Sequence, residues 1–153
     1  MPSRALIEFL DRNAVKYVSI RHSIAYTAQE VAASAHVPGN EMAKTVMVKL
    51  DGEMAMAVTR APDKVDLDLL RGAAGAGKAE LAAEQEFAHL FPGIEPGAMS
   101  PFGNLYDLPV YVDGALTQDE TVSFNAGTHT ELVQLAYADF ARLVEPKVAS
   151  FTR

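Results

Sequence analysis

A chain of 153 residues, of which 49% are apolar, is long enough for one folded domain over residues 1–153 and too apolar for a disordered segment. Its 13 basic and 20 acidic side chains give a net charge of −7, which disfavours binding along a nucleic-acid backbone, so we expect no duplex-DNA partner. The sequence has no cysteine, no signal-peptide pattern and no apolar run of membrane-spanning length, so we expect a cytoplasmic protein without disulfides or a membrane partner.

Two capping signals organise the first part of the chain. Ser3 precedes an amphipathic segment and is a predicted N-cap. Thr27, followed three residues later by Glu30, forms the capping-box pattern, in which each side chain satisfies a free N–H at the start of a helix. The predicted elements here are a helix over residues 3–13, a strand over 15–20 and a helix over 28–35.

Turn residues separate the remaining elements. Asp51-Gly52 predicts a tight hairpin between two strands, and Asp113-Gly114 predicts a second turn. Two-residue turns require antiparallel neighbours, so we predict an α+β domain with one mixed, mostly antiparallel sheet of about six strands flanked by helices. The predicted strands are 44–50, 53–59, 108–112, 121–125 and 130–135, and the predicted helices are 65–71, 79–89 and 138–144, the last ended by Pro146.

The segment Gly72–Lys78 matches the first seven positions of a phosphate-binding loop. The eighth position holds Ala79, where a hydroxyl should bind magnesium, and the preceding residues are predicted to be helical instead of a buried strand. We therefore interpret this segment as a flexible joint between two helices.

Metal and serine-nucleophile chemistry find little support in the sequence. The four histidines, His22, His36, His89 and His129, include no helical pair, and without cysteine a zinc site would need distant carboxylates. No serine lies in a nucleophile-elbow pattern. We expect neither a metal nor a cofactor, and each histidine taken alone has an ordinary structural interpretation.

The segment Gly97–Asn104 is the first candidate for chemistry. Glycines permit backbone angles closed to other residues, and Pro101 stiffens the middle of the segment. Such a loop brings main-chain N–H groups close to a carbonyl or phosphate oxygen. The alternative is a tight connection between a helix and a strand.

Lys44 is the second candidate, because it opens the apolar strand 45–50. A lysine at the start of a buried strand is a fixed cation beside the sheet, placed to meet an anionic or carbonyl oxygen. The alternative is a solvated lysine at a strand end.

Five short motifs in this order resemble the YbaK/prolyl-tRNA-synthetase-associated domain family, the freestanding relatives of the editing insertion of bacterial prolyl-tRNA synthetases. The resemblance covers residues 15–145 and implies a YbaK-like fold and removal of a wrong amino acid from mischarged tRNA in trans. The motifs are His22-x4-Thr27-x2-Glu30, Ala43-Lys44-Thr45-Val46, Gly97-x3-Pro101-x-Gly103, Pro109-Val110-Tyr111-Val112-Asp113 and Asn125-Ala126-Gly127-Thr128-His129.

The resemblance also implies roles for single residues. Lys44 matches the family's lysine and would position the 3′ end of the tRNA, while Gly97 and Pro101 match its Gly-x-x-x-Pro loop, whose N–H groups would polarise the ester carbonyl. These three are the expected catalytic residues. The expected substrate-binding residues are His22, Tyr26, Thr45, Met99, Ser100, Gly103, Gly127 and His129.

The expected substrate is the acceptor end of a tRNA carrying a small amino acid, namely alanine, serine, threonine or cysteine, and an aminoacyl-tRNA synthetase is a possible partner. Ile24, Tyr26, Val46 and Met99 are expected to build part of a small pocket, with Lys49 and Arg60 extending a cationic patch around Lys44. The proton acceptor stays open among a water, the neighbouring ribose hydroxyl and the substrate's own amine or side chain. Two alternatives remain, a non-catalytic module that binds an aminoacyl or nucleotide end, and a hydrolase of other esters.

Overall fold

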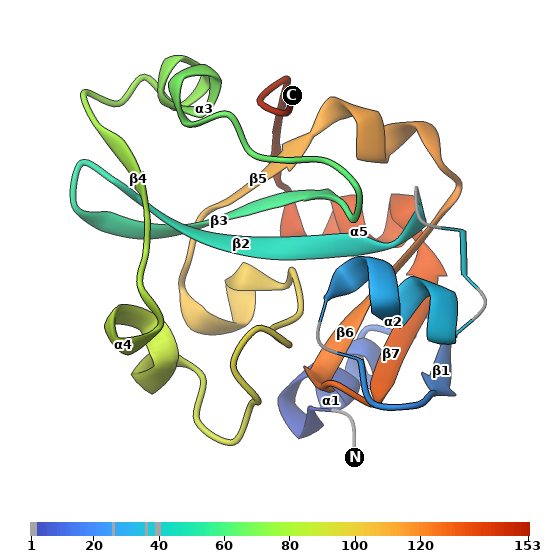
Figure 1. The fold of residues 1–153 in the computed structure, drawn as a ribbon. Coiled ribbons are helices and arrows are strands. Elements are labelled where there is room, and N and C mark those ends of the chain that lie inside the picture. The colour runs from blue at the N-terminus through green and yellow to red at the C-terminus, as the bar shows by residue number, and fades with distance from the viewer. Residues whose placement is uncertain (1–2, 26, 36, 39–40) are drawn as a thin grey trace.

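The computed structural model describes residues 3–25, 27–35, 37–38 and 41–153, and its architecture confirms the α+β class (Figure 1). The described strands number eight and form two sheets, where the sequence predicts about six strands in one. An antiparallel sheet has the order β1-β7-β6, and a mixed sheet has the order β4-β2-β3-β5-β8. In chain order the elements are α1 (Arg4–Arg12), β1 (Tyr17–Arg21), α2 (Ala28–Ser34), β2 (Ala43–Leu50), β3 (Glu53–Arg60), α3 (Leu67–Ala74), β4 (Ala79–Leu81), α4 (Glu84–Phe87), the 3-10 helices η2 (Ala88–Leu90) and η3 (Gly103–Tyr106), β5 (Val110–Asp113), the 3-10 helix η4 (Gly114–Gln118), β6 (Thr121–Thr128), β7 (Glu131–Ala136), α5 (Tyr137–Val144) and β8 (Lys147–Ala149).

Both predicted N-caps are confirmed, but the Glu30 side chain of the expected capping box bonds the Thr27 hydroxyl instead of a backbone N–H. The Ser3 hydroxyl accepts a hydrogen bond from the backbone N–H of Leu6 at 3.5 Å, and α1 buries Leu6 completely. The Thr27 hydroxyl accepts from the N–H of Glu30 at 3.1 Å and donates to the Glu30 carboxylate at 2.9 Å, which fixes the start of α2. Both helices are short. The hydrogen bonds at their caps and the packing of one apolar face therefore determine where each helix begins.

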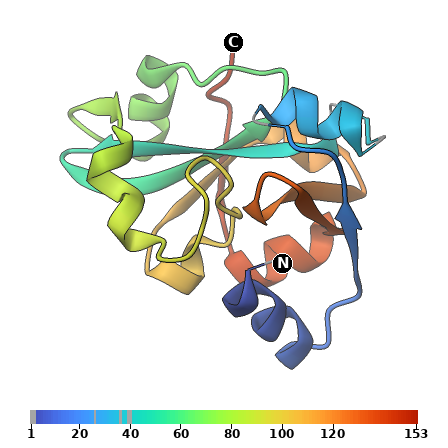
Figure 2. The same ribbon diagram turned by 60° about the horizontal axis from the view of Figure 1, so that its bottom comes forward.

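The predicted hairpin is also confirmed. β2 and β3 pair over their full length, and the turn residues Asp51 and Gly52 both have positive φ, at 52° and 84°, as the tight hairpin turn requires. The four residues 55–58 of β3 are each at most 1% exposed, because both faces of this strand are covered. Figure 2 shows α3 on one side of the hairpin and α1 with α5 on the other.

The prediction of a helix over residues 79–89 is wrong. Residues 79–81 form β4, which pairs antiparallel with β2, and the N–H of Ala82 donates to the carbonyl of Met47. Only α4 and η2 after it are helical. Strand pairing with β2 outweighs the helix propensity of the alanine-rich sequence, which is a weak local preference.

One strand near the C-terminus was not predicted, and one predicted turn is wrong. Residues 147–149, after Pro146, form β8, which pairs in parallel with β5. The Asp113-Gly114 step does not make a two-residue turn but begins η4, with Asp113 as its N-cap. A parallel strand pairs with a segment that is distant in the sequence. The local sequence of such a short strand therefore does not predict it.

The glycine-rich segment before β4 binds a side chain of the protein itself. The backbone N–H groups of Gly77 and Lys78 donate to the carboxylate of Asp51 at 3.0 and 2.9 Å. A carboxylate therefore takes the place that a phosphate would occupy in a nucleotide-binding loop. The segment joins α3 to β4, a helix to a strand instead of two helices.

Aromatic packing fixes the chain around residue 102. Phe102 is fully buried, and its ring centre lies 5.5 Å from that of Phe124 in β6 and 5.4 Å from that of Phe140 in α5. Burial of one such side chain contributes about 2–3 kcal/mol. The loop that leads into Phe102 is thereby held against β6.

No helix in the described part of the chain is long and apolar enough to cross a membrane.

Gly103 packs where a side chain has no room. A Cβ atom there would lie 2.6 Å from Cγ2 of Val110 and 2.8 Å from the carbonyl oxygen of Leu108. In a close-packed core, the Leu108 carbonyl and the branched side chain of Val110 cannot both move away from an added Cβ. Glycine at this position is therefore a packing requirement.

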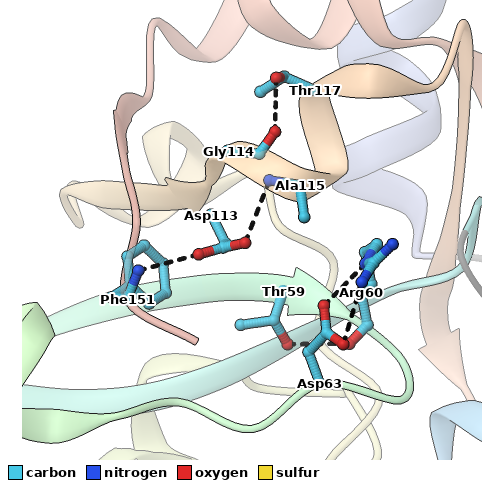
Figure 3. Close-up of polar contacts among 8 residues, drawn as sticks. All are labelled: Thr59, Arg60, Asp63, Asp113, Gly114, Ala115, Thr117 and Phe151. Atoms are coloured by element: carbon cyan, nitrogen blue, oxygen red, sulfur yellow. Dashed lines mark hydrogen bonds and ion pairs between the residues drawn. The ribbon is translucent and has the colours of Figure 1, made fainter. Parts of the chain in front are cut away.

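A buried carboxylate ties the end of β5 to the C-terminal segment (Figure 3). Asp113, 3% exposed, accepts hydrogen bonds from the N–H of Ala115 at 3.1 Å and from the N–H of Phe151 at 2.9 Å. Phe151 is fully buried between α3 and the five-stranded sheet. One side chain thus holds η4 and the last residues in place.

We predict that Asp113→Ala lowers the free energy of unfolding by about 2–4 kcal/mol, because it leaves two N–H groups without their charged acceptor. Urea denaturation followed by circular dichroism measures this loss. The control is Glu120→Ala, since Glu120 is an exposed carboxylate in the neighbouring segment and its replacement should change stability by less than about 0.5 kcal/mol. Equal stability of the two variants would contradict the role of Asp113.

We also predict opposite effects of alanine at two glycines. Gly103→Ala should lower the free energy of unfolding by about 1–3 kcal/mol through steric overlap. Gly72→Ala, inside α3 with nothing within 4 Å of the added Cβ, should raise it by about 0.5–1 kcal/mol. Thermal and urea unfolding of both variants test this pair. An unchanged free energy of unfolding for Gly103→Ala would show that the surrounding core adjusts to the added Cβ.

Candidate functional site

A cavity of about 370 Å³ opens where the two sheets meet. Figures 1 and 2 both place α2 at the end of the hairpin where β2 begins, and the cavity lies between this helix and that strand. Three further segments complete the lining: the residue after β3, the loop before Phe102, and β6. The lining residues are Thr27, Ala28, Gln29, Ala43, Lys44, Thr45, Ala61, Gly97, Met99 and Asn125.

Hydrogen bonds between segments distant in the sequence hold the cavity together. Met42, just before β2, makes a parallel bridge with Ser123 of β6, and its carbonyl accepts from the N–H of Ala61 at 2.7 Å. The loop before Phe102, on the opposite side of the cavity from β2, both donates a backbone hydrogen bond to Gly127 and accepts one from it. The N–H of Gly127 donates to Ala98 at 2.9 Å, and the N–H of Glu95 donates to Gly127 at 2.9 Å. The loop and β2 are therefore both fixed to β6.

Lys44 is the cation of the cavity. Burial lowers the pKa of its amine below the ordinary lysine value, with the carboxylate of Asp63 opposing this shift and the amine of Lys64 adding to it. Asp63 itself is paired with Arg60, at 2.7 Å from Nε (Figure 3). Among the described residues, no carboxylate lies within ion-pair distance of Lys44. Its amine is thus available to an anionic or carbonyl oxygen.

The expected cationic patch around Lys44 does not form. Lys49 is paired with Glu86 and Glu80, and Arg60 with Asp63, so neither adds an available charge. Neither residue lines the cavity.

The loop presents its backbone to the cavity. Gly97 has φ of +84°, a conformation that favours glycine, and Gly97 and Met99 both line the cavity. The N–H of Ala98 is used within the loop, donating to Glu95 at 3.0 Å. In contrast, the N–H groups of Gly97 and Met99 donate to no described residue. Two residues with unpaired main-chain donors and one lysine therefore line the same cavity, a combination that suits oxygen-rich ligands.

The other residues of the Gly-x-x-x-Pro segment lie behind this lining. Ser100 is 4% exposed, and its hydroxyl accepts from the N–H of Phe102 at 3.4 Å. Pro101 and Gly103 are buried, and Gly103 packs against Val110. The structure does not place Ser100, Pro101 or Gly103 in contact with the cavity, and they back the loop instead.

His129 and Gly127 hold the loop from β6. The His129 ring nitrogen Nε2 donates to the carbonyl of Pro96 at 2.9 Å, and its backbone N–H donates to Glu95 at 2.9 Å. Gly127, with φ of +99°, sits where the register of β6 shifts and lines a separate cavity beside Ser3. Neither lines the cavity of Lys44, so both position the loop.

The remaining expected residues divide into two groups. Thr45 lines the cavity, whereas His22 is buried outside it, with its Nδ1 donating to the carbonyl of Ser23 at 2.7 Å. Ile24 is 65% exposed and Val46 packs beside α3, so neither builds the pocket. Tyr26 lies outside the described residues.

Three polar residues of the lining were not predicted, namely Thr27, Gln29 and Asn125. Thr27 carried a capping signal that explained its presence fully, and Gln29 carried none. Asn125 belonged to a motif in which only the glycine and the histidine were given roles. In the described ranges, no group of three or more His, Asp or Glu residues could hold a metal ion.

Comparison with known proteins agrees with these observations. The family model of the aminoacyl-tRNA editing domain matches residues 22–143. The multifunctional Ser/Thr-tRNA deacylase ProXp-y of Escherichia coli K12 is 26% identical over 153 residues, covering 97% of this chain and 91% of the relative. The proline–tRNA ligase of Staphylococcus saprophyticus is 28% identical over 130 residues, covering 78% of this chain and 23% of the ligase. The chain thus spans less than a quarter of that ligase.

The fold has the same relatives. A solved structure of a candidate trans-editing enzyme for prolyl-tRNA synthetase superposes with a TM-score of 0.82 at 20% identity, covering 98% of this chain and 96% of the other. The expected YbaK-like architecture is therefore confirmed. Because the family model matches residues 22–143, which is most of this chain, the chain belongs to the aminoacyl-tRNA editing domain family.

Proposed function

We propose that this protein is a trans-editing deacylase, which hydrolyses the ester between a small amino acid and the 3′ end of a mischarged tRNA. The observation that carries the proposal is the shared cavity of Lys44 and the Gly97 loop. Family membership and the name of one relative, a Ser/Thr-tRNA deacylase, support the same chemistry.

In this proposal Lys44 holds the terminal phosphate or ribose of the tRNA. Its amine has no carboxylate partner among the described residues and lies half-buried, where an ionic contact is stronger than in water. Fixing one end of the substrate places the ester at a constant distance from the loop, and such positioning lowers the barrier of the reaction.

The loop would stabilise the charge that develops on the ester oxygen. Gly97 and Met99 line the cavity, and their N–H groups have no acceptor in the described structure. Donors that are already oriented need no rearrangement when the tetrahedral intermediate forms, and removal of one such donor typically slows a reaction by about 10²–10³.

The described lining contains no carboxylate and no histidine, and the proposal assigns its one titratable side chain, Lys44, to the phosphate or ribose. We propose that a water attacks the ester carbonyl and the ribose oxygen leaves as a hydroxyl. The proton of the attacking water passes to a second water, to the neighbouring ribose hydroxyl, or to the amine or side chain of the substrate. The wall of the cavity combines alanine side chains at positions 28, 43 and 61 with the larger side chain of Met99. We propose that the part of the cavity that receives the acyl group accepts alanine, serine, threonine or cysteine and excludes larger side chains by size.

The charge of the protein fits a substrate that enters by one end only. At a net charge of −7 the surface repels a long phosphate backbone, and a single available lysine suffices for the acceptor end. A synthetase partner would supply further contacts to the tRNA body, which this chain does not need for the hydrolysis itself.

We predict that Lys44→Ala lowers kcat/KM for deacylation of mischarged tRNA by at least about a hundredfold, because the 3′ end is no longer positioned. Release of labelled amino acid from a panel of tRNAs carrying alanine, serine, threonine or cysteine measures the effect. Lys49→Ala is the matched control, since Lys49 lies on the same strand but is already paired with carboxylates. Binding of these tRNAs without hydrolysis by the wild type would contradict the proposal and favour a non-catalytic binding module.

A pH dependence follows from the buried amine. Because burial lowers the pKa of Lys44, phosphate binding should be complete below that pKa and disappear as the pH rises through it, earlier than for an exposed lysine. Lys44→Arg should retain binding further into the alkaline range, since a guanidinium stays protonated there. Calorimetric titration with a non-hydrolysable, amide-linked aminoacyl-adenosine 5′-phosphate measures both profiles. Identical pH profiles for the wild type and Lys44→Arg would show that Lys44 does not contact the phosphate.

A further inference from the structure

The amide of Asn125 is a polar group of the cavity that the proposed hydrolysis leaves unused. The side chain lines the cavity and the residue is 7% exposed. Its oxygen Oδ1 is buried and has no hydrogen-bond partner among the described residues. Buried amide oxygens are nearly always paired in folded proteins, so an unpaired one at a ligand cavity calls for a ligand group.

The strand determines where this amide lies. Its neighbours Phe124 and Ala126 are buried in the core shared with Phe102, so Asn125 lies on the opposite face of β6. On that same face, Ser123 is satisfied internally, because its hydroxyl accepts from Nε2 of Gln134 at 3.1 Å. Of these two polar residues of β6, only Asn125 reaches the cavity.

The chemistry of the lining selects among the donors that a substrate offers. The described lining carries Lys44 and no carboxylate, which disfavours an ammonium group as the partner of Asn125. A neutral hydroxyl both donates and accepts, as does an amide, and a half-turn of the amide exchanges Oδ1 with Nδ2. A hydroxyl can therefore donate to Oδ1 of Asn125 without bringing a second positive charge close to Lys44.

We propose that Asn125 hydrogen-bonds the side-chain hydroxyl of a seryl or threonyl group and so makes the cavity prefer these substrates over alanyl. This inference rests on the proposed deacylase function and specifies its substrate class. A site built to bind a hydroxyl rejects the analogue that lacks it, because its own polar group then stays buried and unpaired. Asn125 is thus a specificity-determining residue and takes no part in breaking the ester.

The test compares seryl and alanyl groups on the same tRNA, because they differ only by the hydroxyl. Wild-type protein should show a higher kcat/KM for the seryl substrate, and Asn125→Ala should reduce the seryl-to-alanyl ratio by about tenfold. Asn125→Leu fills a similar volume without an acceptor and should give the same loss of ratio. Ser123→Ala, a buried polar residue on the same face of β6, is the matched control and should leave the ratio unchanged.

A second measurement separates this inference from the deacylase proposal. Binding of amide-linked seryl- and alanyl-adenosine needs no turnover, so an Asn125-dependent preference for the seryl compound supports the inference even if no ester is hydrolysed. An equal loss for both substrates in Asn125→Ala, or a ratio that Asn125→Ala and Asn125→Leu leave unchanged, would overturn it. Hydrolysis by the wild type with no seryl preference would also overturn it while leaving the deacylase proposal intact.

Discussion

The site depends on one pair of backbone hydrogen bonds, in which Gly127 of β6 accepts from Glu95 and donates to Ala98. These bonds attach the loop before Phe102 to a sheet other than the one that carries Lys44. The His129 ring adds a bond to Pro96, and Phe102 fixes the far end of the loop in the core. The loop is thereby rigid without secondary structure of its own, and rigid donors are the ones that stabilise developing charge well.

Each side of the cavity comes from a different layer of the fold. Lys44 belongs to the five-stranded sheet, Asn125 to the three-stranded sheet, and Thr27 to the helix that covers the end of the hairpin (Figure 1). The bridge between Met42 and Ser123 is where the two sheets touch. A ligand in the cavity therefore contacts both sheets at once, and the position of the cation relative to the loop is set by the packing of the whole domain.

Local chemistry made part of this structure predictable. The caps at Ser3 and Thr27 and the turn at Asp51 act over a few residues, so the sequence reveals them directly. The short strands β4 and β8 depend on partners far along the chain and carry no such signal. In the site, Lys44, Thr45, Gly97 and Met99 were predicted and do share a cavity, whereas Asn125 was not, because only the folded strand shows that its amide lacks a partner. Gly103 and Gly127 were predicted from their motifs to touch a ligand, yet steric contact and backbone angle account for both.

Lys44 is the one charged residue in the described lining of the cavity, and this has a consequence for the proposed function. A protein that grips a polymer through one phosphate releases about one condensed counterion, so its affinity changes little with ionic strength. The acidic protein would repel the rest of the polymer, so contacts to the acyl group and the 3′ end would supply most of the affinity. Weak retention of the emptied tRNA would then let the molecule sample many charged tRNAs in succession, which suits a proofreading step that acts on rare errors.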